Sequence, residues 1–325
     1  MKTKPVLPTI AVLLLAVGAA SAFAPPGESV PEPALVKAAV EVRQRTLHAV
    51  TSGACIFVAV GAGGAILASD DAIQWEPQAS VTDAALNAVV YGADRFVAVG
   101  NTGTILTSPD ASAWRAVKSP VTAPLCGLTH AAGQFIAVGA SGVILTSPDG
   151  LAWTQQKSGV SGLLRSVAHG KGRFVIVGPE RTALMSRDGV NWRSYDTASA
   201  LNLRGVAFGD GLFVAVGCSG AALSSRDGIQ WTPRPSGTVE PLRGIIWAED
   251  HFVAVGTHGV IVSSADARQW HARPTKAIWH LNALTADSGT LVAVGAGGVI
   301  LTTSSPAAQW TSRNRHSKTI AFTDP

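Results

Sequence analysis

Arginine occupies the same place in three consecutive stretches of the chain, at Arg165, Arg204 and Arg243, which are separated by 39 residues. Each one follows a leucine. A guanidinium group binds a carboxylate or a phosphate through two parallel hydrogen bonds, so three such groups in one place would hold an acidic partner. These three residues are therefore candidate binding residues, provided that the fold brings their positions together.

Two further sites in the sequence extend this candidate surface. His48 stands at the corresponding place earlier in the chain, and Trp279-His280 is an aromatic pair without a counterpart elsewhere. A tryptophan beside arginines is typical of protein-binding surfaces. We predict a binding surface formed by Arg165, Arg204, Arg243, His48, Trp279 and His280. A solvated polar rim is the simpler interpretation, and the sequence leaves it open.

Glu180 and Tyr195 suggest a different chemistry. The segment Pro179-Glu180-Arg181 replaces glycines that the neighbouring stretches carry, and Tyr195 follows a tryptophan nearby. Sialidases use a tyrosine nucleophile, and a Tyr/Glu pair close to the arginines would resemble such a site. A glycan-binding or sialidase-like protein is therefore the alternative, although a single substituted turn also arises by drift.

Other catalytic and metal-binding patterns are absent from the sequence. We find no nucleophile elbow, phosphate-binding loop, zinc-ligand spacing or Cys-His motif. The eight histidines show no i, i+2 or i, i+4 clustering. Cys55, Cys126 and Cys218 are an odd set, and their spacing indicates no disulfide. We predict no catalytic residue, metal or cofactor, and leave open whether the protein is an enzyme.

A repeat of 39 residues must position all of these side chains. The phrase FVAVG or a close variant begins at Phe57, Phe96, Phe135, Phe174, Phe213, Phe252 and Leu291. A leucine stands ten residues before each phrase, and a tryptophan closes each unit. Short Val/Ile/Phe blocks between Gly-rich turns predict strands rather than helices. Four strands in about 40 residues are typical of a propeller blade.

The sequence therefore predicts an all-β fold, a seven-bladed β-propeller of four-stranded antiparallel blades over residues 47–319. A closed ring places equivalent positions around one axis, so the three arginines should meet near one mouth of the central channel. Within each unit, the fourth strand is expected to begin at the tryptophan. Residues 36–40 and residues 310–312 are alternative candidates for the strand that closes the ring.

An SxDGxxW phrase, or a relative of it, precedes the fourth strand in six units. A carboxylate there can accept N–H bonds from its own turn, and glycine tolerates the left-handed conformation that follows. Three units carry Ala72, Ala111 or Ala267 instead of glycine, which predicts that this position does not need a positive φ in every blade. We expect a structural role for the six aspartates Asp71, Asp110, Asp149, Asp188, Asp227 and Asp266.

The first residues are typical of a secretory signal. Lys2 and Lys4 precede an apolar run, and small residues end at Ala22, which predicts a signal peptide over residues 1–22. The apolar run is too short to span a membrane. We thus expect an exported protein, periplasmic or extracellular, with a linker over residues 23–46 and a tail over residues 320–325. No transmembrane segment is expected in the mature chain.

The charge of the chain argues against nucleic acid as a partner. Without the two lysines of the signal, 23 basic side chains oppose 21 acidic ones, so the formal net charge falls from +4 to +2. Proteins that bind nucleic acid or another polyanion normally carry a much more basic surface. We expect one or more protein partners and a monomeric protein.

Seven units with LRxV, FVAVGxxGxILTS and DGxxW phrases after a signal peptide resemble the Asp-box propellers of the photosystem II stability/assembly factor family and its bacterial relatives. The resemblance covers residues 47–319. It implies a non-enzymatic scaffold for assembling membrane complexes, with arginines on one face that contact the client, at Arg165, Arg204 and Arg243 by position. The DGxxW box is shorter than that of the family. Sialidases share the box but have six blades, which counts against the alternative.

Overall fold

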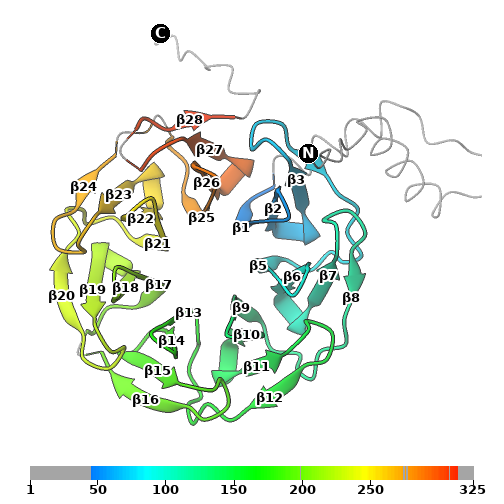
Figure 1. Ribbon diagram of the computed structural model, residues 1–325, viewed down its shortest axis with the longest axis horizontal. Helices are drawn as coiled ribbons and strands as arrows, with labels where there is room; N and C mark the ends of the chain where they lie inside the picture. Colours follow the sequence, from blue (N-terminus) through cyan, green and yellow to red (C-terminus); the bar gives the residue numbers. More distant parts are fainter. Residues whose placement is uncertain (1–44, 198, 274, 276, 307, 314–325) are drawn as a thin grey trace, which may run out of the picture.

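The computed structural model describes residues 45–313, except residues 198, 274, 276 and 307. The expected signal peptide, residues 36–40 and the expected tail lie outside the described residues. Seven four-stranded antiparallel sheets surround a central axis (Figure 1). The predicted all-β, seven-bladed propeller is thus confirmed, with strand one of each blade nearest the axis and strand four at the periphery.

The blades follow one another along the chain. The first two contain β1 (Leu47–Gly53), β2 (Ile56–Gly61), β3 (Ile66–Ser69) and β4 (Glu76–Pro77), then β5 (Leu86–Gly92), β6 (Arg95–Gly100), β7 (Ile105–Ser108) and β8 (Arg115–Ala116). The third and fourth contain β9 (Leu125–Ala131), β10 (Gln134–Gly139), β11 (Ile144–Ser147) and β12 (Thr154–Gln156), then β13 (Ser166–Gly170), β14 (Arg173–Val177), β15 (Thr182–Ser186) and β16 (Arg193–Asp196).

The remaining blades continue the pattern. The fifth and sixth contain β17 (Leu203–Gly209), β18 (Leu212–Gly217), β19 (Ala221–Ser225) and β20 (Thr232–Pro235), then β21 (Leu242–Ala248), β22 (His251–Gly256), β23 (Ile261–Ser264) and β24 (His271–Ala272). The seventh contains β25 (Leu281–Asp287), β26 (Thr290–Gly295), β27 (Ile300–Thr303) and β28 (Thr311–Ser312). Six short 3-10 turns connect second and third strands: η1 (Ala62–Gly64), η2 (Asn101–Gly103), η3 (Ala140–Gly142), η4 (Cys218–Gly220), η5 (Thr257–Gly259) and η6 (Ala296–Gly298).

The strand register gives the ring two distinct faces. Leu47 at the start of β1 pairs with Gly61 at the end of β2. The starts of the first strands, the 3-10 turns and the connections between blades therefore lie on one side, which we call the mouth face. The hairpins between first and second strands and the aspartate turns lie on the other side, which we call the box face.

The ring closes between the seventh and first blades. In the described residues, neither of these two blades contributes a strand to the sheet of the other. Thr311–Ser312 forms the fourth strand of the seventh blade against β27, as one of the two alternatives predicted. Side chains hold the closing seam, where Leu47 and Val50 pack with Val292 and Val294.

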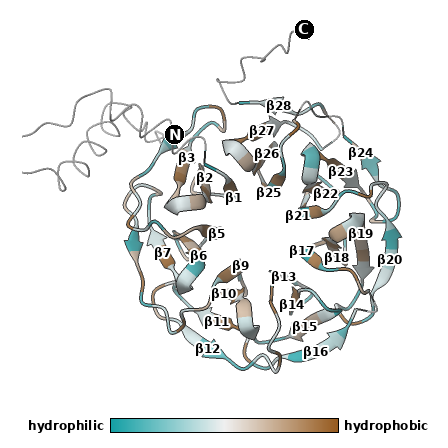
Figure 2. Ribbon diagram, turned by 180° about the vertical axis from the view of Figure 1, so that it is seen from behind, coloured by the Kyte–Doolittle hydropathy of each residue, from teal (hydrophilic) through white to brown (hydrophobic). Residues whose placement is uncertain are grey.

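Apolar side chains fill the seams between neighbouring blades. One such core joins Val58 and Ile66 of the first blade to Phe96 and Trp114 of the second. Figure 2 shows apolar strands near the axis and more hydrophilic strands at the periphery. The tryptophans pack in these seams. The fourth strands begin one residue after them, as at Thr232, and not at the tryptophan as predicted.

The aspartate turns share one hydrogen-bond pattern. In each of the six, Oδ1 accepts the N–H groups two and three residues on and the hydroxyl of the serine two residues before, over 2.7–3.2 Å. These backbone bonds lower the pKa of Asp149, Asp188 and Asp266. For Asp71, Asp110 and Asp227 the largest single effect is burial, which raises the pKa. The hydrogen bonds together outweigh it, so the pKa of these three groups is also lowered.

The expectation for the alanine-bearing turns is wrong. Ala72, Ala111 and Ala267 have φ of 59°, 66° and 58°, in the same left-handed region as the glycines of the other boxes. The bonds to the aspartate fix the turn, so the alanine adopts a conformation that costs roughly 1 kcal/mol. Each of these alanines is buried.

A row of aromatic residues at the box-face end of the first strands escaped the sequence analysis. Tyr91, His130, His169, Phe208 and Trp247 recur at the 39-residue step in five consecutive blades. Each ring packs on the phenylalanine of its own blade, with ring centroids 4.4–4.8 Å apart. Four of the five lie directly over a glycine of the preceding blade, where a Cβ would overlap the ring.

We expect Gly209→Ala to destabilise the propeller. Its Cβ would collide with the Trp247 indole, which also packs against Phe252 of its own blade. Overpacking of this kind costs roughly 1–3 kcal/mol. Thermal unfolding should show a lower Tm for Gly209→Ala, whereas Gly162→Ala, with nothing within 4 Å, serves as the control. Equal Tm values for the two variants would contradict this packing.

The two histidines of the aromatic row should make stability depend on pH. Burial lowers the pKa of His130 and His169 below the ordinary value of 6.5. The folded protein then binds fewer protons than the unfolded chain, so stability is lost as the pH falls below 6.5. His130→Tyr with His169→Phe copies the residues of the neighbouring blades and should flatten the dependence of Tm on pH between pH 7 and pH 5. An unchanged slope would show that these rings do not carry the effect.

Candidate functional site

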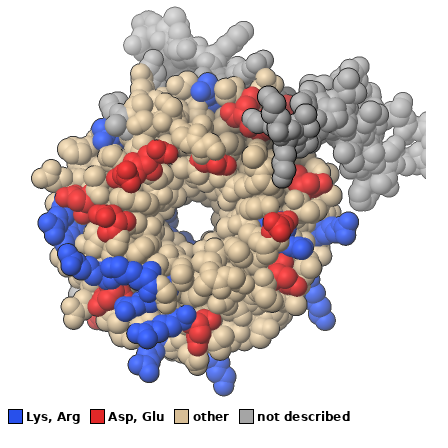
Figure 3. All heavy atoms as spheres, in the orientation of Figure 1, with Lys and Arg blue, Asp and Glu red and all other residues tan. Residues whose placement is uncertain are grey.

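The three predicted arginines occupy equivalent places on the mouth face. Arg204 and Arg243 are the second residues of β17 and β21, and Arg165 immediately precedes β13. All three side chains are half-buried. Figure 3 shows the channel, at whose edge these strands lie, open through the ring. We call the three residues together the arginine mouth.

The guanidinium groups of the arginine mouth influence one another electrostatically. Burial, and then the charges of Arg204 and Arg165, lower the pKa of Arg243, with Cys218 acting in the opposite direction. Arg243 Nη1 donates to Asn282 Oδ1 over 3.0 Å, and Arg204 Nε contacts Cys218 Sγ at 3.4 Å. The Nε atoms of Arg165 and Arg243 are buried and have no hydrogen-bond partner among the described residues.

In three of the other four blades this position connects neighbouring strands, whereas the third blade has Cys126 there. His48 Nδ1 lies 3.1 Å from the carbonyl oxygen of Leu86, and Asn87 Nδ2 donates to the carbonyl oxygen of Leu125 over 2.8 Å. Asn282 Nδ2 donates to Leu47 O over 2.8 Å across the closing seam. We call these three links, made by His48, Asn87 and Asn282, the inter-blade girdle. His48 therefore belongs to this girdle, away from the arginines. The sequence analysis did not detect the linking role of the two asparagines.

Trp279 and His280 lie in the connection between the sixth and seventh blades. Trp279 is 55% exposed. The His280 ring packs edge-on against His258, with centroids 5.3 Å apart, and its Nδ1 accepts the His258 N–H over 3.2 Å. Glu240 Oε2 lies 2.9 Å from His258 Nδ1 and accepts the Thr257 hydroxyl, and these bonds lower the pKa of Glu240.

Exposed apolar side chains lie beside the arginine mouth, and the sequence analysis missed this feature. Val239 is 81% exposed and Ile278 is 75% exposed, and Leu201 and Trp279 are also exposed. All four are in the connections that lead into β17, β21 and β25, within four residues of the first strands. The mouth face therefore combines guanidinium groups with an apolar rim.

The similarity to solved propellers is clear in structure and low in sequence. The fold resembles that of YCF48. YCF48 from Cyanidioschyzon merolae is 18% identical, with a TM-score of 0.65 over 80% of this chain and 95% of that one. YCF48 bound to D1 peptide is 15% identical, with a TM-score of 0.67 over 80% and 91%. The WD40 propeller domain of Doa1 is 13% identical, with a TM-score of 0.65 over 79% and 92%.

The other two comparisons give no match. No protein-family model matches the chain, and no curated protein does. At the identities above, the structural likeness establishes the seven-bladed fold alone. Membership of the photosystem II stability/assembly factor family therefore stays a prediction.

The alternative site does not assemble as the sialidase interpretation requires. Tyr195 lies in β16, the outermost strand of its blade, and pairs with Ala183. Two strands separate it from β13, which at roughly 4.8 Å per strand places it about 14 Å from the channel edge. Glu180 is exposed, and Arg181 pairs with Asp196 over 2.8 Å.

The described part of the chain shows neither a metal-binding cluster nor a membrane-spanning helix. No group of three or more His, Cys, Asp or Glu side chains there is arranged to hold a metal ion. None of its helices is long and apolar enough to cross a membrane. Cys55, Cys126 and Cys218 are free thiols. Burial raises the pKa of Cys126, against the nearby charge of Arg165.

Asn282→Ala should weaken the closing seam. The substitution removes the bond to Leu47 O and the acceptor of Arg243 Nη1, which leaves two part-buried groups unpaired and costs roughly 1 kcal/mol or more. The Tm should fall by several degrees, since 1 kcal/mol corresponds to about 2–4 °C in a domain of this size. The exposed Asn202 offers a control, and a Tm loss as large in Asn202→Ala would contradict the assignment.

Proposed function

We propose that this protein is an exported, non-enzymatic scaffold that binds a protein partner at the arginine mouth. An acidic group of the partner, a side-chain or terminal carboxylate, would bind the guanidinium groups of Arg165, Arg204 and Arg243. The apolar rim with Trp279 and His280 would contact the apolar side chains around it. Biogenesis of a membrane complex is the process that the family resemblance suggests.

The observation that carries this proposal is the uncompensated charge of the mouth. Three half-buried arginines occupy equivalent positions in neighbouring blades, and the charges of Arg204 and Arg165 lower the pKa of Arg243. The Nε atoms of Arg165 and Arg243 lack a hydrogen-bond partner in the described residues. Buried polar groups in proteins are normally hydrogen-bonded, so an unpaired donor here favours a ligand with acceptors. A carboxylate supplies both the acceptor and the opposite charge.

The surroundings of the mouth favour a protein over a small molecule. Exposed Val239, Ile278 and Trp279 add apolar area outside the channel, and aromatic and arginine side chains are enriched in the core of protein interfaces. The solved structure of YCF48 bound to D1 peptide offers an example of a similar propeller with a peptide. The expected signal over residues 1–22 supports a periplasmic or extracellular location.

Charge reversal at the mouth should abolish partner capture without unfolding the ring. In the triple variant Arg165→Glu, Arg204→Glu, Arg243→Glu, carboxylates replace the guanidinium groups that the partner needs. We expect crosslinking and pulldown from a periplasmic extract to lose the bands that the unchanged protein retains, while the Tm changes by only a few degrees.

A matched control separates this effect from net charge. Arg95, Arg115 and Arg193 are the first residues of β6, β8 and β16, at the box-face ends of these strands and away from the mouth face. Reversing these three gives the same change in net charge and should leave capture intact. If the mouth variant captures the same partners as the unchanged protein, the docking surface lies elsewhere.

The glycan alternative is tested with the same protein. Turnover of a fluorogenic sialoside that Tyr195→Phe abolishes would replace the scaffold proposal with an enzyme. No catalysis is expected, because Tyr195 lies on the outermost strand, apart from the arginine mouth.

A further inference from the structure

An open hollow lies on the box face between the fifth and sixth blades, on the opposite side of the ring from the arginine mouth. Its volume is about 540 Å³, within the range of small-ligand sites. The hairpin after β17, the aspartate turn of the fifth blade, β20 and the aspartate turn of the sixth blade form its walls. Lys171 reaches in from the fourth blade and donates to Gly211 O over 2.8 Å.

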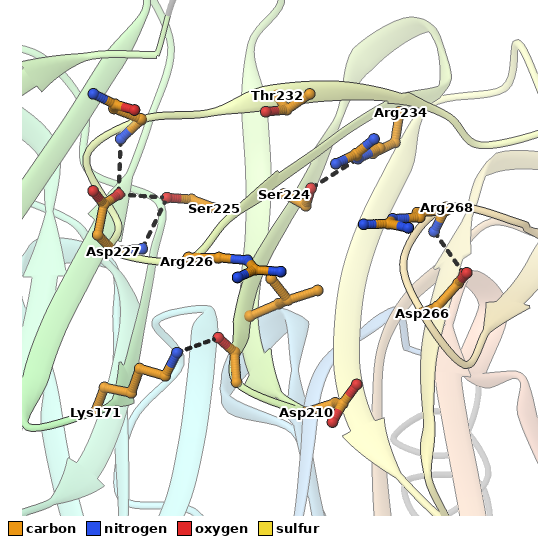
Figure 4. A pocket seen from close by; sticks show the side chains of 13 residues that line it. Lys171, Asp210, Ser224, Ser225, Arg226, Asp227, Thr232, Arg234, Asp266 and Arg268 are labelled. Atoms are coloured by element: carbon orange, nitrogen blue, oxygen red, sulfur yellow. Dashed lines mark hydrogen bonds between the residues drawn. The ribbon is translucent and has the colours of Figure 1, made fainter.

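Three guanidinium groups face this hollow. Figure 4 shows Arg226, Arg234 and Arg268 directed toward the same space from three different segments. Arg234 Nε donates to Ser224 Oγ over 2.9 Å, which fixes its side chain. Within the described part of the chain, the side chains of Arg226 and Arg268 make no hydrogen bond. Their donor groups are therefore available to a ligand with oxygen acceptors.

The carboxylates of the hollow are not equivalent. Asp227 and Asp266 each use Oδ1 in their own turn, and Arg268 and Asp266 lie close enough for the charge of Arg268 to help lower the pKa of Asp266. Asp210 makes no hydrogen bond or ion pair with the described residues. A bare anion would be repelled by Asp210, whereas a ligand with hydroxyl groups next to its anion would donate to that carboxylate.

The fourth to sixth blades carry more basic side chains than the first three. Residues 164–280 contain thirteen basic and nine acidic side chains, whereas residues 45–163 contain five and seven. Three of the thirteen basic side chains belong to the arginine mouth on the other face. Figure 3 shows basic side chains gathered over the lower left of the ring, where the fourth and fifth blades lie, and acidic ones spaced around the channel. Such a field attracts anionic ligands to one side of the molecule.

We infer that the hollow is a second binding site, for a sugar that carries a phosphate or sulfate ester. Arg226 and Arg268, with Arg234 behind them, bind the oxyanion. Asp210 accepts hydrogen bonds from the sugar hydroxyls. The site is independent of the proposed docking function, because it lies on the other face and shares no residue with the arginine mouth.

Calorimetric titration of the mature protein at constant ionic strength tests this site. The probes are glucose 6-phosphate, N-acetylglucosamine 6-sulfate, glucose and inorganic phosphate. We expect saturable binding of at least one ester, tighter than that of inorganic phosphate, and none of glucose. The two esters separate the phosphate source from the sulfate source. Absence of saturable binding for both esters would overturn the inference.

Single substitutions test the residues. Arg226→Ala and Arg268→Ala should each weaken ester binding by about tenfold or more, the effect of losing a charged hydrogen bond. Arg187→Ala is the matched control, because Arg187 holds the place of Arg226 in the fourth blade and does not line the hollow. Equal losses in Arg187→Ala and Arg226→Ala would mean a diffuse field instead of a site.

Asp210→Ala tests the hydroxyl contact. The variant should bind inorganic phosphate at least as well as the unchanged protein, because a repulsive charge is gone, and should lose its preference for the ester. A preference that survives in Asp210→Ala would contradict the assignment of a sugar ester. The Tm of every variant, measured beside the titration, shows that loss of binding does not come from unfolding.

Discussion

The close approach of neighbouring inner strands is the constraint on which this ring depends. Four of the five aromatic side chains in the row lie over a glycine of the preceding blade, and each one packs on its own phenylalanine. The seam cores of Val, Ile and Phe then bury each sheet against the next. One blade alone could not bury both of its surfaces, so the units are stable only as neighbours.

This packing leaves the ends of the strands as the positions where blades can differ. The strand interiors are committed to the seams, whereas the first residues of each inner strand and the connecting turns are free to differ. At the mouth face, the second residue of the inner strand is an asparagine that bonds to the next blade in some blades, as at Asn87 and Asn282. In three other blades the same position is an arginine. At one of these three positions the link to the next blade is kept in another form, because Arg243 Nη1 donates to Asn282 Oδ1.

The fold could be predicted from the sequence because the marker residues recur every 39 residues. A repeat of constant length indicates that each unit forms the same four-stranded blade. It also located the arginine mouth, since equivalent positions meet around an axis. The aromatic row was harder to detect because Tyr, His, Phe and Trp share a position without sharing a residue type. The hollow could not be found from the repeat, as Arg226 and Arg268 occupy different places in their units and meet only across a seam. The left-handed alanines were misjudged because the aspartate, not the following residue, determines the turn.

The contiguity of each blade has a topological consequence. In the described residues, every sheet is built from one uninterrupted segment, and the closing seam is joined by side chains in the same manner as the other six. The backbone therefore does not distinguish the closing seam from the other six. A circularly permuted chain that starts at the second blade and ends with the first would therefore retain the same interfaces between blades.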